Sequence, residues 1–272
     1  MNSLDANSLI LCSGELYADP IPTSECLACA LRLKKPPCGY GYRILKAIFM
    51  GQEDRTSEIH VTDVNNCLLK SYLDKTEPVP EMVHKMFFKF IGIAIHNALD
   101  FNDDHVWSEV PVSGLGIVGR IDAIIDGSDI EDVKTTRKLT PWKTQGNHDI
   151  QLNIYRHLAG KRGDLRVQYL DMMGPTKCLS CGVIMEMIGG VVQCPLCGHT
   201  TKSAHLGAVL VDVPVLDPDD VKGLIEEQVT ELKMALATKT PPPPAPGWLC
   251  GYCGHTECPF NKSNGDNNGT RE

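Results

Sequence analysis

The sequence lacks any apolar run near the roughly 20 residues that a membrane-spanning helix needs. Its first residues, MNSLDANSLILCSGE, lack the basic flank and the long apolar stretch of a signal peptide. It also lacks an excess of positive charge: 26 Lys and Arg against 34 Asp and Glu give a formal net charge of −8, which argues against a general nucleic-acid coat. These absences predict an intracellular, cytoplasmic protein without a membrane segment.

Twelve cysteines are the unusual part of a composition that is otherwise ordinary, with 42% hydrophobic and 22% charged residues. In a reducing compartment, cysteines are more often metal ligands than disulfides. A chain of 272 residues is long enough for one sizeable core and small appended modules. We therefore expect a globular domain with metal-bound segments.

The hydrophobic pattern predicts strands framed by helices. Apolar residues recur at helical spacing between Glu81 and Asp100, and Asp149–Leu158 also suits a helix. Strands are expected at Gly116–Ile125, Ile130–Thr135, Leu165–Met172 and Leu206–Val215. Asp217-Pro218-Asp219-Asp220 is typical of a helix start, and this helix should end before the proline-rich spacer 241–246. Together these elements predict an α/β domain.

Two aspartates and a lysine in the segment GRIDAIIDGSDIEDVKTT (119–136) have the pattern of a metal-dependent phosphodiesterase centre. Asp122 ends one predicted strand and Asp132 lies on the next, so a hairpin would bring the two carboxylates together. Asp132 and Lys134 should point the same way because side chains on a strand alternate between faces. The carboxylates could hold a divalent cation against a phosphate, while Lys134 positions or deprotonates water and offsets negative charge. Alone, an Asp-x-Lys pair is more commonly a solvated surface pair.

Three further residues have a spacing that supports this centre. His96, near the end of the predicted helix 81–100, could be a metal ligand or a phosphate contact, although a lone histidine there is more often a core or capping residue. Gln151 and Tyr155 share one helical face and could hydrogen-bond a DNA backbone or the lysine. Residues 131–170 hold eight Lys or Arg against four Asp or Glu, so this stretch is either a phosphate-steering patch or a solvated loop. Its dominant run is Lys134, Arg137, Lys138 and Lys143.

In this order, the motifs resemble the RecB-like branch of the PD-(D/E)XK nuclease superfamily, whose pattern is Gly…His, Asp, Asp/Glu-x-Lys and Gln-x-x-x-Tyr. The matching residues are Gly92 and His96, Asp122, Asp132 and Lys134, and Gln151 and Tyr155. Within that branch, the sequence looks most like the CRISPR-associated exonuclease family (the fourth Cas protein), over about residues 60–260. The resemblance implies a restriction-endonuclease-like core, a central mixed sheet flanked by helices, with Mg²⁺ or Mn²⁺ held by Asp122 and Asp132 with His96 assisting.

The same resemblance implies an iron–sulfur cluster, usually 4Fe–4S. VTDVNNCLLKSYL (61–73) looks like the start of that family's domain and GWLCGYCGHTECPF (247–260) like its end. The implied ligands are Cys67, Cys250, Cys253 and Cys258. Cys-x-x-Cys geometry also suits zinc, and Cys26, Cys29 or Cys38 could supply the first ligand in place of Cys67. A metal that closes so long a loop would strongly restrain the unfolded chain.

The other eight cysteines predict zinc. Cys178-x-x-Cys181 and Cys194-x-x-Cys197, twelve residues apart and each followed by glycine, are typical of a zinc ribbon, here an insertion over 174–204. This ribbon could clamp DNA, contact a partner or staple the local fold. A second zinc could be held by the less regularly spaced Cys12, Cys26, Cys29 and Cys38 of an N-terminal cysteine-rich module, 1–55. The nuclease domain would then span 56–260, followed by a disordered tail, 261–272.

Three functions compete for these motifs. The leading hypothesis, from the resemblance, is a Mg²⁺- or Mn²⁺-dependent DNA exonuclease that acts mainly on single-stranded DNA, in CRISPR spacer acquisition or in recombination and repair. The alternative is a DNA-binding scaffold subunit of an adaptation or recombination complex that cleaves little by itself. A zinc-ribbon interaction factor would leave the acidic centre and the final cysteines unexplained. The intact Asp-Asp-Lys set favours the nuclease.

Overall fold

The computed structural model of this chain describes residues 8–12, 19–33, 36, 38–50, 57–136, 144, 147–172, 176–188, 191–201, 207–251 and 253–261. These residues belong to two compact units, Met1–Leu99 with Gln228–Glu272, and Asp100–Glu227. Three residues of the predicted basic run, Arg137, Lys138 and Lys143, lie outside the described residues, as does the predicted tail after Asn261. None of the described helices is long and apolar enough to cross a membrane.

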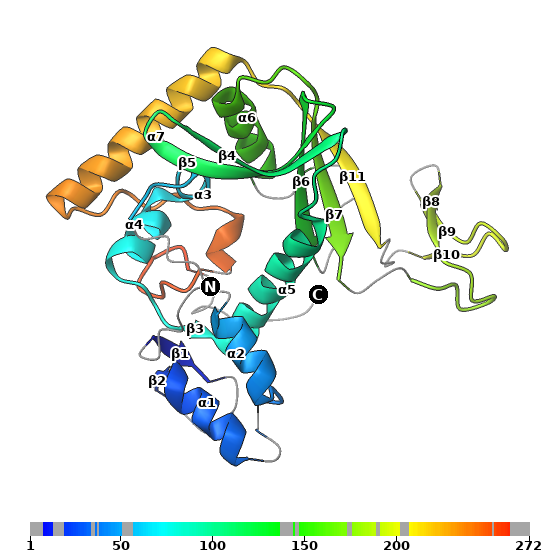
Figure 1. The fold of residues 1–272 in the computed structure, drawn as a ribbon, viewed down its shortest axis with the longest axis horizontal. Helices are drawn as coiled ribbons and strands as arrows, with labels where there is room; N and C mark the ends of the chain where they lie inside the picture. The colour runs from blue at the N-terminus through cyan, green and yellow to red at the C-terminus, as the bar shows by residue number, and fades with distance from the viewer. Residues whose placement is uncertain are drawn as a thin grey trace. The chain divides into compact units, whose positions relative to one another are not determined.

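The second unit is built on a five-stranded mixed sheet in the order β11-β7-β6-β5-β4 (Figure 1). Its strands are β4 (Val106–Gly114), β5 (Ile117–Ile125), β6 (Asp129–Thr136), β7 (Leu165–Asp171) and β11 (Ala208–Val213). Strands β6 and β7 are parallel, and the other neighbours are antiparallel. The predicted α/β fold with a mixed sheet and helices is confirmed, and four of the five strands lie where the sequence predicts them.

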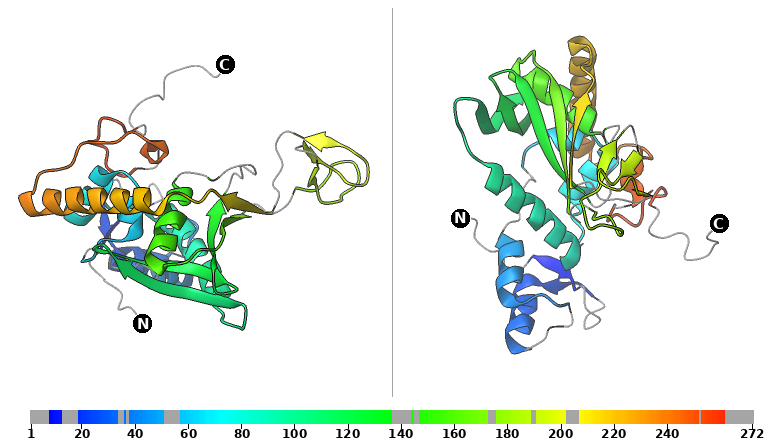
Figure 2. Two further views of the ribbon diagram at one scale, coloured as in Figure 1. Left: turned by 90° about the horizontal axis from the view of Figure 1, so that it is seen from above. Right: turned by 90° about the vertical axis from the view of Figure 1, so that its right-hand side faces the viewer.

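Helix α6 (His148–Ala159) packs on one face of this sheet, against β4, β5, β6 and β7 (Figure 2). It ends at Gly160, whose φ of 62° is the left-handed conformation typical of a helix C-cap. Leu152 and Ile154 of this helix are fully buried. Burial of these apolar side chains holds α6 on the sheet and thereby fixes the position of the polar side chains that it carries.

Two tight turns fix the register of the central strands. The turn at 126–128 is where the sequence predicts it, with a hydrogen bond from Ser128 N to Ile125 O (3.1 Å). Leu115 and Gly116 both have a positive φ, 51° and 81°, which is the two-residue hairpin turn that matches the twist of the strands. This second turn joins β5 to β4, which the sequence analysis does not predict. Pro111 disfavours a strand, but an edge strand such as β4 tolerates it.

Three short strands form a separate antiparallel sheet, yellow-green in Figure 2. They are β8 (Glu186–Ile188), β9 (Val191–Gln193) and β10 (Thr200–Thr201). The buried side chains here are only Cys178, Met185 and Cys194 among the described residues. So small an apolar core is insufficient to hold a fold without a metal or a disulfide.

The first unit begins with a three-stranded sheet of β2 (Ile21–Pro22), β1 (Leu9–Leu11) and β3 (Glu81–Met82). Helices α1 (Thr23–Arg32), α2 (Tyr42–Met50) and α5 (Val83–Leu99) contribute to one core with it, which includes Ile10, Leu27, Leu45, Ile48 and Val83. The described part of the first fifty residues therefore shares a core with α5. The division at residue 55 stays a prediction.

A second apolar cluster in this unit joins α4 (Leu68–Thr76) to the last part of α7 (Pro218–Thr238). Its buried members are Leu68, Tyr72, Leu232 and Ala235. A short helix, α3 (Val61–Val64), precedes α4, and a 3₁₀ turn, η1 (Trp248–Gly251), follows the proline-rich spacer. This packing places the start of α4, with Cys67 directly before it, inside the first unit.

Candidate functional site

Asp122 of β5 and Asp132 of β6 lie opposite each other, because Ala123 pairs with Glu131 in the antiparallel register. Asp132 is only 1% exposed, and its Oδ2 lies 2.6 Å from Nζ of Lys134. Asp122 Oδ2 accepts a hydrogen bond from the backbone N–H of Val133 (2.7 Å). The structure thus brings together the three residues that the sequence singles out in the hairpin.

The second oxygen of Asp132, Oδ1, is buried and has no hydrogen-bond donor among the residues that the structure describes. An ionised oxygen in this situation is costly unless a cation or a donor satisfies it. Carboxylate oxygens are the ligands preferred by Mg²⁺ and related hard cations. The donor set of Asp122 and Asp132 therefore fits a divalent metal ion.

The charges in this hairpin strongly affect one another. Burial and the neighbouring Asp132 carboxylate raise the pKa of Asp122 to about 7. Burial alone would lower the pKa of Lys134, but the carboxylates of Asp132 and Asp122 outweigh it and raise this pKa above its ordinary value. Lys134 is therefore a cation at neutral pH, and a bound metal ion would favour full ionisation of Asp122.

Gln151 and Tyr155 lie on α6, one helical turn apart as the sequence predicts, and they contact each other. Gln151 Nε2 donates a hydrogen bond to the Tyr155 hydroxyl (3.1 Å), and both side chains are buried. Burial raises the pKa of Tyr155, and the charges of Asp132 and Lys134 also act on it. The pair thus adjoins the acidic hairpin as a neutral hydrogen-bonding group.

Sequence reasoning missed His148, the first residue of α6. Its Nδ1 lies 2.9 Å from the hydroxyl of Tyr169, and Tyr169 pairs with Lys134 in the parallel β6–β7 register. Burial is the main cause that lowers the pKa of His148 to about 4, and the charge of Lys134 is the second, so the imidazole is neutral. The spacing of His148 could have indicated its place in the site, since residues 148, 151 and 155 lie on one face of a helix.

His96 lies in the last turn of α5, in the first compact unit. Its role as a metal ligand stays a prediction.

A model of the PD-(D/E)XK nuclease superfamily matches residues 52–258, most of the chain. The chain belongs to this superfamily. This membership indicates a metal-dependent nuclease.

Two solved structures are similar to this superfamily member. The crystal structure of SSO0001 has 18% sequence identity and a TM-score of 0.49, and the match covers 80% of this chain and 94% of that chain. The crystal structure of a phage related exonuclease from Haemophilus somnus 129PT has 11% identity and a TM-score of 0.39, with 68% and 95% covered. No curated protein sequence matches the chain.

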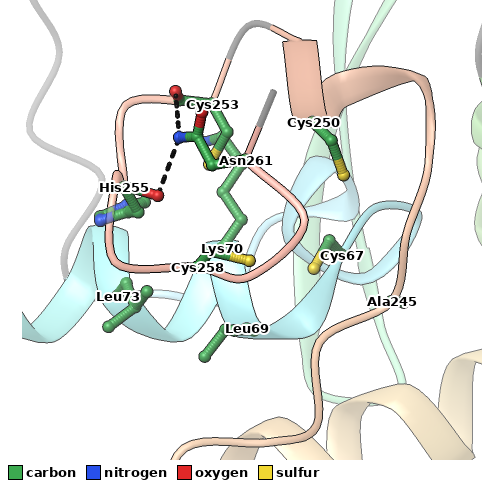
Figure 3. A pocket seen from close by; sticks show the side chains of 10 residues that line it. All are labelled: Cys67, Leu69, Lys70, Leu73, Ala245, Cys250, Cys253, His255, Cys258 and Asn261. Carbon is green, nitrogen blue, oxygen red and sulfur yellow. Dashed lines mark hydrogen bonds between the residues drawn. The ribbon is translucent and has the colours of Figure 1, made fainter. Parts of the chain in front are cut away.

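A second candidate site of this nuclease-superfamily chain is a pocket lined by Cys67, Cys250, Cys253 and Cys258 (Figure 3). The described residues that line it do not include Cys26, Cys29 or Cys38, the alternative first ligands. Four thiols around one space are a donor set that suits a thiolate-bound metal.

Hydrogen bonds hold the C-terminal cysteine loop on α4. Buried His255 places Nε2 2.7 Å from Oδ1 of Asp74, on α4. Asn261 Nδ2 donates to the backbone oxygens of Cys253 (3.1 Å) and His255 (2.9 Å), as Figure 3 shows. Lys70 and His255 keep the pKa of Asp74 low although burial opposes them. The loop therefore keeps its cysteines beside Cys67 through contacts that need no metal.

A third candidate site is the cluster of Cys178, Cys181, Cys194 and Cys197, whose sulfur atoms all lie within 4.8 Å of one another. The sulfur atoms of Cys181 and Cys194 lie 3.3 Å apart. Each Cys-x-x-Cys turn closes with a hydrogen bond from the following glycine, Gly182 N to Cys178 O (2.8 Å) and Gly198 N to Cys194 O (2.9 Å). The positive φ of both glycines, 73° and 72°, explains their place in the motif. This cluster could hold a metal ion.

The N-terminal cysteines also lie near one another. Cys26 and Cys29, one turn apart on α1, are buried, and Cys12 packs against the same core. Burial, followed by the charges of Cys38, Cys12 and Cys29, raises the pKa of Cys26 to about 12. Cys38, Cys12 and Cys29 therefore lie near enough to act on Cys26, and a second zinc held by these four stays a prediction.

Proposed function

We propose that this chain is a Mg²⁺- or Mn²⁺-dependent DNA exonuclease that hydrolyses phosphodiester bonds, mainly in single-stranded DNA. The observation that carries the proposal is the acidic hairpin, in which Asp122, Asp132 and Lys134 converge and a buried oxygen of Asp132 has no donor among the described residues. Membership of the PD-(D/E)XK nuclease superfamily supports it.

In this proposal, Asp122 and Asp132 hold the metal ion, with His96 as a further ligand. A divalent metal polarises the phosphoryl oxygen and lowers the pKa of water bound to it. Lys134 positions the water and offsets negative charge that develops on the phosphate. Its raised pKa favours these roles over that of a general base, since a protonated amine cannot accept a proton. Gln151 and Tyr155 orient the DNA strand by hydrogen bonds.

The preference for single strands and for ends, and the cellular role, rest on the resemblance to the CRISPR-associated exonuclease family. We assign the chain to the cytoplasm, as a DNA-processing partner of CRISPR adaptation proteins or of recombination and repair proteins. The described part of the chain carries no helix that could span a membrane, in line with that assignment.

We also propose three structural metal groups. A 4Fe–4S cluster occupies the pocket of Cys67, Cys250, Cys253 and Cys258, where it ties the end of the chain to α4. Zinc occupies the cluster of Cys178, Cys181, Cys194 and Cys197, because tetrahedral thiolate sites of paired Cys-x-x-Cys turns are typical of zinc ribbons. A second zinc lies among Cys12, Cys26, Cys29 and Cys38.

The test is digestion of end-labelled single- and double-stranded DNA by cluster-loaded protein with Mg²⁺ or Mn²⁺. The parent is compared with Asp132→Ala and with Asp212→Ala, which removes an exposed carboxylate from β11 of the same sheet. We expect metal-dependent shortening from an end, lost in Asp132→Ala and kept in Asp212→Ala. Binding of DNA without cleavage by the parent would instead favour the scaffold subunit.

A further inference from the structure

Glu109 has an unusual backbone conformation in the middle of β4. Its φ is 53°, in the left-handed region that residues other than glycine rarely adopt. Glu109 is not paired in the β4–β5 ladder. Because Ser108 pairs with Ala123 and Val110 with Ile121, Glu109 lies opposite Asp122. Such a conformation persists only where the surrounding structure imposes it, and it is frequent at functional sites.

Two carboxylates lie close together at this position. Glu109 and Asp122 each offer a carboxylate oxygen within 4.8 Å of the other's. Like charges on directly opposite residues of antiparallel strands destabilise a sheet. The position therefore combines an uncommon backbone conformation with a like-charged neighbour, and a cation bound by both carboxylates would remove the repulsion between them.

Glu109 forms an ion pair with Arg120. Arg120 Nε lies 2.7 Å from Glu109 Oε2, but the Arg120 side chain is 53% exposed. Ion pairs with such exposure contribute little to stability. The pair can orient the Glu109 carboxylate toward a bound metal ion.

We propose that Glu109 is a third carboxylate ligand of the divalent metal ion held by Asp122 and Asp132. The inference rests on the proposed metal-dependent nuclease and adds a residue to its centre. Oδ1 of Asp132, in a side chain only 1% exposed, has no donor within the described part of the chain, which independently indicates a cation at this place. A divalent ion turns the repulsion between Glu109 and Asp122 into attraction to a shared charge.

The test is Mn²⁺ binding by the full-length, cluster-loaded protein. Binding is measured by electron paramagnetic resonance, as the decrease of the signal of free Mn²⁺. Glu109→Gln keeps the shape of the side chain and removes its charge. The matched control is Glu131→Gln, the same substitution at a half-buried position of β6 next to Asp132. Asp132→Asn defines the signal that belongs to the centre, and Arg120→Gln removes the ion pair but keeps the carboxylate.

We expect Glu109→Gln to raise the Kd for Mn²⁺ at least tenfold, whereas Glu131→Gln leaves it unchanged. Arg120→Gln should have a smaller effect than Glu109→Gln, because it only loosens the ligand. Without metal, Glu109→Gln should melt at or above the temperature of the parent, since a repulsion is removed. Added Mn²⁺ should then raise its melting temperature less than that of the parent.

Equal Kd values for Glu109→Gln and Glu131→Gln would overturn the inference and leave the centre of Asp122 and Asp132 intact. Equal losses in Glu109→Gln and Arg120→Gln would also overturn it, since the ion pair would then be the reason for Glu109. If the parent bound no more Mn²⁺ than Asp132→Asn, the proposed metal centre itself would fail, and the inference with it.

Discussion

Asp122→Asn should stabilise the metal-free protein at alkaline pH while it abolishes the stabilisation by metal. The raised pKa of Asp122 means that the folded protein holds this proton more tightly than the unfolded chain does. The asparagine oxygen can still accept the hydrogen bond from Val133 N. The substitution therefore removes the buried charge and keeps the local structure.

The size of the effect follows from the pKa. Raising it from 3.8 to about 7 corresponds to at most about 4 kcal/mol, at about 1.4 kcal/mol per pKa unit. Well below pH 3.8 the carboxyl is protonated in both states, so it costs nothing. As the pH rises from 4 to 7, the unfolded chain ionises first and stability falls. Above pH 7 the full cost is present, and Asp122→Asn should raise the melting temperature by several degrees.

The assay is thermal melting of parent and Asp122→Asn between pH 5 and pH 8.5, in Mg²⁺-free buffer and with Mg²⁺ added. Asp212→Asn serves as the control because Asp212 is an exposed strand carboxylate of the same sheet. The gain should grow with pH in Mg²⁺-free buffer and should shrink or reverse with Mg²⁺. A metal-free Asp122→Asn protein that melts below the parent at pH 8 would refute this account of the charges.

Three further changes test other parts of the molecule. Lys134→Ala should lower DNA cleavage at least a hundredfold and change DNA affinity only a few-fold, because Lys134 offsets charge at one phosphate; undiminished turnover would contradict this. Cys253→Ala should lose the visible absorbance of the iron–sulfur cluster and melt earlier, because the pocket then lacks a ligand; melting like that of the parent would argue against the cluster as a fold staple. Cys194→Ser should lower the zinc content by one ion per chain, measured by elemental analysis, whereas an unchanged content would exclude this ligand.

The acidic hairpin could be predicted because its determinants are local. The turn residues 126–128 and the alternating pattern of β5 and β6 specify an antiparallel pair, and the register then places Asp122 opposite Asp132. The contact between Gln151 and Tyr155 is likewise local, because the two residues are four positions apart on one helix. The two Cys-x-x-Cys-Gly turns of the zinc-ribbon candidate are local in the same sense, since each closes on its own glycine.

The remaining site geometry depends on pairings between distant segments, and these leave no local pattern. Lys134 lies beside Tyr169, which contacts His148, only because β6 and β7 are parallel neighbours in the sheet. In the sequence, α6 lies between these two strands. Strand β4 escapes prediction because Pro111 and its half-exposed side chains give no clear alternation. Glu109 is the extreme case, since propensity favours no positive φ at a glutamate. Because a positive φ opposes the local preference of glutamate, only tertiary interactions can stabilise this conformation of Glu109. We expect the relevant interaction to be the metal ion that Asp122 and Asp132 are proposed to hold.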